Sequence, residues 1–135
     1  MSKNKNLQRI PTIVNLNRLR KLVASECVIG ELPVGIEALK ELRELRLPKN
    51  RLKEIPAVFG DLLRLESVDL SNNGLQRLPI TLGHLTRIQE WNVKGNTIEY
   101  PPNDLSQEWK SLFQFSTDLL KGNQKCNFVK LIIVI

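Results

Sequence analysis

The sequence has few of the residues that build catalytic and metal sites. Among its 135 residues there are one histidine, His84, and two cysteines, Cys27 and Cys126, which lie far apart in the chain. No His-Glu-x-x-His, paired Cys-x-x-Cys or Gly-x-Ser-x-Gly pattern occurs, so no metal cluster, disulfide framework or activated nucleophile is indicated. We therefore expect no catalytic residue, metal, nucleotide or other cofactor, and we interpret the chain as a non-enzyme.

Aromatic residues and long apolar segments are also scarce. Aromatic side chains make up 5% of the chain, so a core has to be built from aliphatic side chains. No apolar segment follows Met1 as in a secretory signal, and no stretch approaches the roughly 20 apolar residues of a membrane span. Together with the two separated cysteines, these absences favour a reducing, cytoplasmic location.

Acidic residues are absent from the first 21 positions, which hold six of the 20 basic residues. The remaining residues balance 14 basic against 14 acidic side chains. We interpret residues 1–10 as a flexible basic leader that faces solvent. Contact of this leader with an acidic membrane stays an alternative. Nucleic-acid binding is not expected, because dense Lys/Arg runs and interleaved aromatic side chains are missing.

Apolar residues recur with a period of 23 that does not slip across four units. Leu45 and Leu47 are two apart, so both point to one face of a short strand. The proline that follows the next apolar position ends strand pairing. Each unit is therefore predicted to contain a strand and a 3₁₀ or helical return segment. The aligned columns include Leu19/Leu42/Leu65/Ile88, Leu22/Leu45/Val68/Trp91, Ala24/Leu47/Leu70/Val93 and Pro33/Pro56/Pro79/Pro102.

The pattern L-x-x-L-x-L-x-x-N/C-x-L-x-x-L-P resembles the leucine-rich repeat over residues 19–105. The resemblance implies an α/β fold, a short right-handed solenoid with parallel strands on its concave face and 3₁₀ or helical segments on its convex side. One unit cannot bury its apolar face alone, so neighbouring units stack. The resemblance divides the array into 19–41, 42–64, 65–87 and 88–105, and it implies a structural ladder of turn-bonding side chains at Cys27, Asn50, Asn73 and Asn96.

Both ends depart from the repeat. Residues 11–18 match the convex half of a degraded N-terminal half-repeat. Residues 104–121 have the spacing of one amphipathic helix, with Asp104 as its N-cap and Gly122 at its C-terminal end. We expect this helix to cap the last coil, with a partner-docking helix as the alternative. Residues 122–135 are interpreted as a linker and an apolar, strand-like tail.

The junction after the repeats has a second, narrower resemblance. The order of Pro101-Pro102, a short helix and the apolar segment 129–134 is similar to the repeat-to-GTPase junction of the Roco family, which includes the leucine-rich-repeat kinases. This resemblance implies a truncated fragment of a multidomain signalling protein whose repeats recruit or regulate. Residue 135 is Ile where that family has the glycine of the phosphate loop, so nucleotide binding and kinase activity do not carry over.

The outward-facing side chains of the strands are free to vary while the leucines hold the scaffold. We therefore predict a non-catalytic scaffold that binds an unidentified protein partner through the concave face. Arg46 is the best single candidate because arginine is enriched in interface hot spots, and we expect it to form a surface ion pair with Asp69. The predicted binding set is Lys21, Val23, Glu44, Arg46, Ser67, Asp69, Ser71, Glu90, Asn92 and Lys94.

Overall fold

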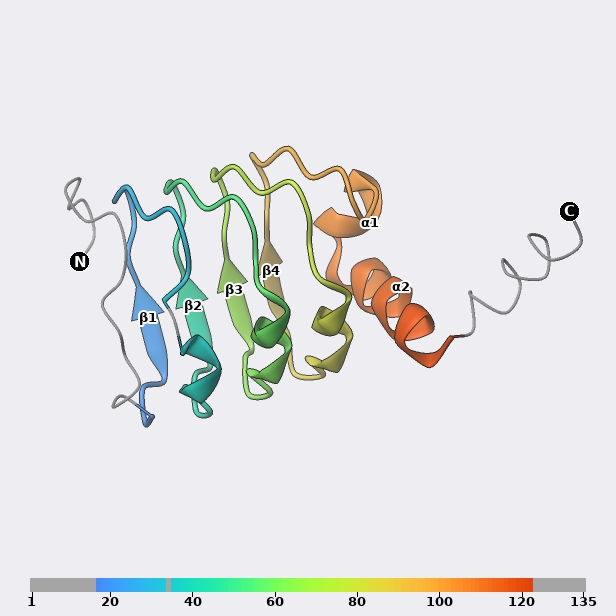
Figure 1. Ribbon diagram of the computed structural model, residues 1–135, viewed down its shortest axis with the longest axis horizontal. Helices are drawn as coiled ribbons and strands as arrows, with labels where there is room; N and C mark the ends of the chain where they lie inside the picture. Colours follow the sequence, from blue (N-terminus) through green and yellow to red (C-terminus); the bar gives the residue numbers. More distant parts are fainter. Residues whose placement is uncertain (1–16, 34, 123–135) are drawn as a thin grey trace, which may run out of the picture.

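A computed structural model describes residues 17–33 and 35–122 of the chain. Its central element is a parallel sheet of four three-residue strands in the order β1-β2-β3-β4 (Figure 1). Each strand begins 23 residues after the preceding one, so successive sequence units lie side by side. The strands are β1 (Lys21–Val23), β2 (Glu44–Arg46), β3 (Ser67–Asp69) and β4 (Glu90–Asn92).

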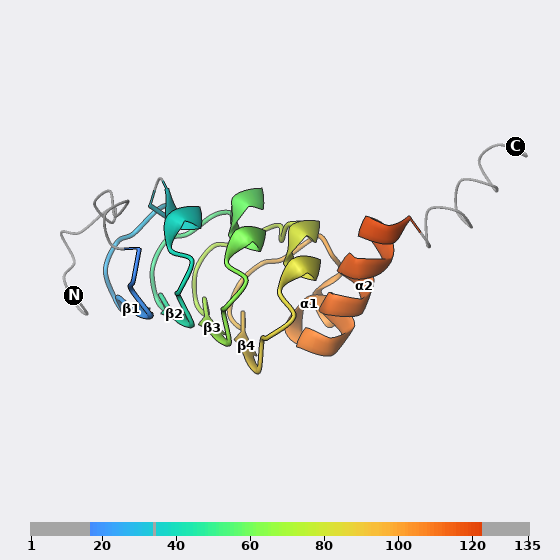
Figure 2. The same ribbon diagram turned by 90° about the horizontal axis from the view of Figure 1, so that it is seen from below.

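Short 3₁₀ helices form the side of the array opposite the sheet (Figure 2). Pro56 and Pro79 immediately precede η2 and η3 in extended conformation. Proline cannot donate to a strand ladder and has a fixed φ, so it ends the extended segment and leads into the return turn. The three helices are η1 (Ile36–Ala38), η2 (Ala57–Asp61) and η3 (Ile80–His84).

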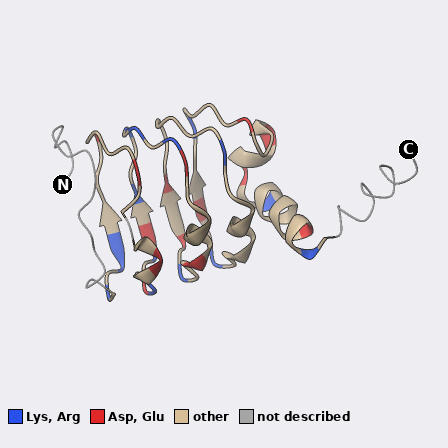
Figure 3. Ribbon diagram, in the orientation of Figure 1, with Lys and Arg blue, Asp and Glu red and all other residues tan. Residues whose placement is uncertain are grey.

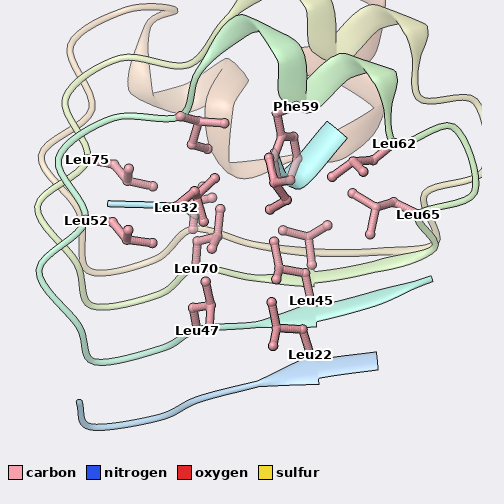
Figure 4. Packing of buried hydrophobic residues seen from close by; sticks show 14 of the residues in the cluster. Leu22, Leu32, Leu45, Leu47, Leu52, Phe59, Leu62, Leu65, Leu70 and Leu75 are labelled. Carbon is pink, nitrogen blue, oxygen red and sulfur yellow. The ribbon is translucent and has the colours of Figure 1, made fainter. Parts of the chain in front are cut away.

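One hydrophobic core fills the space between the strands and the 3₁₀ helices (Figure 4). Leu45 and Leu47 enter it from the strand side, and Phe59, Leu62 and Leu65 enter it from the return side; all five are fully buried. Burial of one such side chain stabilises the fold by about 1.5–3 kcal/mol. The predicted solenoid and aliphatic core are confirmed, and the C-terminal end of the array is helical, as expected.

The C-terminal cap consists of two helices, not the single helix predicted over 104–121. Helix α1 (Asn103–Gln107) and helix α2 (Trp109–Lys121) are separated by Glu108, whose φ of −113° and ψ of 121° are extended. Asp104 lies in the first turn of α1, and Pro102 occupies the N-cap position, so the predicted N-cap was wrong. Gly122 ends α2 in the left-handed region, as predicted.

Helix α2 packs against η3 and covers the last coil. Leu112 and Ser116 are fully buried, and Trp109 packs against the edge of the core. None of the described helices has the length and apolar character that a membrane span requires. The expectations for residues 1–10, for most of 11–18, and for residues 123–135 with Cys126 lie outside the described residues.

Candidate partner-binding face

The register of the sheet aligns two of the predicted binding columns on one surface. We call this surface, together with Ser71 and Lys94 two residues beyond the ends of β3 and β4, the strand face. The first residues of the four strands are aligned across the sheet and form one column. It contains Lys21, Glu44, Ser67 and Glu90. Two residues further along each strand a second column follows. It contains Val23, Arg46, Asp69 and Asn92. The intervening Leu22, Leu45 and Val68 are buried, so the two columns face away from the core.

A chain of charged contacts crosses the strand face. Lys21 Nζ lies 3.4 Å from a carboxylate oxygen of Glu44, and Arg46 Nε donates to the same oxygen at 2.7 Å. Arg46 Nη2 then donates to the Ser67 hydroxyl at 2.9 Å and lies 3.7 Å from Glu90. Because serine is small, the guanidinium extends over β3 to reach a carboxylate on β4.

The predicted ion pair between Arg46 and Asp69 is absent from the described contacts. The two residues are neighbours on adjacent strands, as expected. However, Asp69 Oδ1 accepts bonds from the Ser71 backbone N–H at 3.0 Å and the Ser71 hydroxyl at 2.7 Å. The carboxylate is thus bound to the turn that follows β3, and Arg46 pairs with Glu44 and Glu90 instead.

These contacts change the acidity of the paired groups. The hydrogen bond from Arg46, aided by the charge of Lys21, lowers the pKa of the Glu44 carboxyl, although desolvation opposes the shift. The same hydrogen bond raises the pKa of the Arg46 guanidinium. Both groups are therefore held in their charged forms.

Two of the ten predicted binding residues do not present a contact surface. Ser67 and Ser71 are each only 7% exposed, because Arg46 covers the first and Asp69 holds the second. Asn92 repeats the role of Asp69 one unit later, since its Oδ1 accepts the Lys94 backbone N–H at 3.1 Å. The most exposed of the ten are Lys21, Glu90 and Lys94.

The asparagine column forms hydrogen bonds between neighbouring coils. Asn73 Nδ2 lies 3.0 Å from the Leu47 carbonyl of the preceding coil and 3.0 Å from the Leu70 carbonyl of its own coil. Its Oδ1 accepts the Leu52 N–H at 3.1 Å. Asn50 and Asn96 make equivalent bonds. In the first coil the Cys27 thiol lies 3.6 Å from the Ser25 carbonyl, a weaker contact.

A further column, one position before this ladder, was not predicted from the sequence. Glu26, Lys49 and Asn72 have φ of 56°, 56° and 55°, and Gly95 has φ of 76°. These residues turn the chain off each strand in the left-handed region, which costs non-glycine residues free energy. Of these four residues, only Asn72 and Gly95 are of types that favour the left-handed region. Because glutamate and lysine occupy the other two positions, the sequence did not indicate a shared left-handed conformation.

The two tryptophans do not provide an anchor on the strand face. Trp91 Nε1 donates to the Ser106 carbonyl at 2.8 Å, and its ring centroid lies 5.0 Å from that of Trp109. This pair joins β4 to the C-terminal helices. His84 is exposed in η3, and the described residues contain no group of side chains that could hold a metal ion.

Comparison with known proteins indicates the same architecture. The family model for the leucine-rich repeat matches residues 40–98. A solved leucine-rich-repeat protein of Leptospira interrogans is 30% identical, with a TM-score of 0.62, over 68% of this chain and 24% of that one. The chain therefore spans about a quarter of the length of that structure. No curated protein matches the sequence significantly.

Proposed function

Because this chain is a leucine-rich-repeat protein, we propose that it is a non-catalytic scaffold that binds a protein partner through the strand face. In this proposal the repeats 19–41, 42–64, 65–87 and 88–105 form the binding surface, and α1 and α2 close the array. We further propose that the chain acts in the cytoplasm.

The contacts of Arg46 support this choice of surface most directly. Its side chain is about one-third exposed, and bonds to Glu44 and Ser67 fix its guanidinium in one position. Binding costs less conformational entropy when a contact residue is already ordered in the free protein. The remaining N–H groups of Arg46 can therefore bind a partner with little further loss of side-chain conformational entropy.

The composition of the strand face favours a reversible complex of modest affinity. The exposed residues carry both charges, and Lys21, Glu44, Arg46 and Glu90 are paired with one another. Interface hot spots are usually tryptophan, tyrosine or arginine, and of these only Arg46 is present on the face. A partner has to supply complementary polar groups to this arginine and to the ends of the face at Lys21 and Lys94.

The test compares two variants that leave the core untouched. A partner is first captured with the full chain, identified and purified, and its affinity is measured by calorimetry. Arg46→Ala/Lys94→Glu changes the strand face, whereas the control Asp61→Ala/His84→Ala changes exposed residues on the opposite side. We expect the strand-face variant to lose about tenfold in affinity or more, and the control to bind as the native chain does.

Two outcomes would exclude the strand face. If circular dichroism shows that the strand-face variant is folded and the variant binds with native affinity, the partner binds to another surface of the chain. If only the Asp61 and His84 variant loses affinity, the 3₁₀ side of the array is the binding surface.

A further inference from the structure

A second surface lies where the chain enters the four strands. We call it the basic edge, residues 17–20, 40–43, 63–66 and 86–89. Its turns are stacked by backbone bonds: Arg43 N–H donates to the Arg20 carbonyl at 2.9 Å, and Glu66 N–H donates to the Arg43 carbonyl at 2.8 Å. Cationic segments recur at the lower ends of the coils in Figure 3. The exposed cations are Arg18, Arg20, Lys40, Arg43, Arg64 and Arg87.

The charge of this edge is poorly neutralised within the protein. It holds two carboxylates, Glu41 and Glu66, against the six cations. Glu41 lies between neighbouring coils, 3.9 Å from both Arg20 and Arg64. Among the described residues, Arg43 and Arg87 make no ion pair. The strand face differs, since its central charges are paired with one another, so the basic edge is the stronger attractor for an anionic ligand.

Leu63 places an exposed apolar side chain in the middle of the basic edge. It is 56% exposed, the most exposed of the large hydrophobic side chains in the described structure. The edge has no aromatic side chain, whereas single-stranded nucleic acid is usually held by stacking on aromatic rings. Five of the six cations are arginines, whose planar guanidinium binds a carboxylate through two parallel hydrogen bonds.

We propose that the basic edge binds an extended acidic segment of a partner protein, in which Asp and Glu side chains flank one apolar residue. The carboxylates pair with Arg43, Arg64 and Arg87, and the apolar side chain covers Leu63. Adjacent strands lie about 4.8 Å apart, so the four coils offer a row of cations about as long as a five-residue extended segment. This binding is independent of the strand face and stands if that proposal fails.

The probe is a fluorescein-labelled peptide of about eight residues, long enough to span the edge, with Asp and Glu around a central Leu. Its anisotropy is measured with the full chain at low ionic strength. Arg43→Gln/Arg64→Gln/Arg87→Gln removes three cations from the edge. The matched control Arg51→Gln/Lys53→Gln/Lys110→Gln removes three exposed cations elsewhere. We expect about tenfold weaker binding for the edge variant and native affinity for the control.

Glu41→Gln gives a test in the opposite direction. This change removes the carboxylate that competes for Arg20 and Arg64, so the peptide should bind about twofold to threefold more tightly. Leu63→Ser should weaken binding of the Leu peptide but not of a peptide with Ser at the centre. Equal losses in the edge variant and its control would overturn the proposal, as would unchanged or weaker binding by Glu41→Gln.

Two further probes decide the class of ligand. They are a single-stranded RNA and vesicles containing anionic phospholipid, each compared with the peptide at the same ionic strength. We expect the RNA and the vesicles to bind more weakly than the peptide. Tighter binding of either probe, or no binding of the peptide to the native chain, would overturn the assignment to an acidic protein segment.

Discussion

The Arg46 guanidinium bonds to the Glu44 carboxylate at 2.7 Å within the same strand. Residues two apart in a strand point to the same face, so these side chains can pair without crossing between strands. Asp69, the neighbour on β3, is already bound to Ser71. The local partner therefore takes the place of the cross-strand partner, and Arg46 uses its other nitrogens for Ser67 and Glu90.

This pair predicts a measurable change in acidity. In the native chain the Glu44 pKa lies below the ordinary carboxyl range because of the Arg46 bond. The ionised Glu44 carboxylate therefore contributes to the free energy of unfolding above its unfolded-state pKa. This contribution is lost as the pH falls through the folded-state pKa. Arg46→Gln should raise the Glu44 pKa toward the ordinary range and remove this part of the acid dependence of stability.

Carboxyl resonances followed by NMR during an acid titration measure the effect directly. Lys94→Gln is the control, since it removes a cation from the same face without touching the Glu44 pair. An unshifted Glu44 pKa in Arg46→Gln would show that the bond does not persist in solution.

The period of 23 made the fold predictable, because each leucine column has one physical role in every unit. Leu22, Leu45 and Val68 are buried at equivalent positions, and the strands lie where the columns indicated. The alternation of side chains along a strand also placed the outward columns in register. Sequence periodicity determines both features, so no tertiary information was needed.

The details of the strand face were not predictable from the period. Whether Arg46 pairs with Asp69 or Glu44 depends on which hydrogen bonds Asp69 makes in its own turn. The burial of Ser67 depends on the direction of the Arg46 side chain. The break at Glu108 was missed because the apolar spacing is nearly helical through it. These features arise from competition between side chains, which a repeat pattern does not encode.

The asparagine ladder should carry a large share of the stability between coils. Asn73→Ala removes the acceptor of the Leu52 N–H and the donor to the carbonyls of Leu47 and Leu70. The two carbonyls still accept bonds from Asn50 and Asn96, but the Leu52 N–H is left without a partner. An unsatisfied buried backbone group costs about 1–3 kcal/mol, so we expect the free energy of unfolding to fall by about that amount. Urea denaturation measures this loss. Asn103→Ala, at an exposed asparagine, should change stability little.

Alanine should have different effects at Gly95, which lies in the left-handed column, and at Gly74, which lies outside it. Gly95 has φ of 76°, and a Cβ there would collide with the Asn72 side chain. Gly95→Ala should therefore destabilise the chain by about 1–2 kcal/mol. At Gly74 a Cβ would meet only the Leu52 carbonyl oxygen at 3.5 Å, so Gly74→Ala should be neutral or slightly stabilising. Equal unfolding midpoints in urea for the two variants would contradict this account.

The same column offers a way to stabilise the protein. Lys49 is held at φ of 56° and its ion pair with Glu26 is exposed at 3.6 Å, so the pair contributes little. Asparagine tolerates the left-handed region better than lysine. Lys49→Asn should raise the free energy of unfolding by about 0.5 kcal/mol. Lys53→Asn, at an exposed position outside the left-handed region, is the control and should give no gain.

The docking of α2 on η3 depends on the absence of a side chain at Gly83. A Cβ at this position would lie 2.8 Å from Leu120 Cδ1 and 3.1 Å from both the carbonyl carbon and the Cβ of Ser116. The Leu120 side chain can rotate, but the Ser116 backbone can move only if the helix moves. Gly83→Ala should therefore displace α2 and destabilise the chain by about 1–3 kcal/mol.

Tryptophan fluorescence separates displacement of the helix from a general loss of stability. The rings of Trp91 and Trp109 lie 5.0 Å apart across the contact between β4 and α2, so their emission should change in Gly83→Ala under native conditions. Gly30→Ala is the control, because a Cβ there meets nothing within 4 Å. Native emission and native stability in Gly83→Ala would mean that α2 is not held against η3 in solution, because a docked helix leaves no room for the added methyl group.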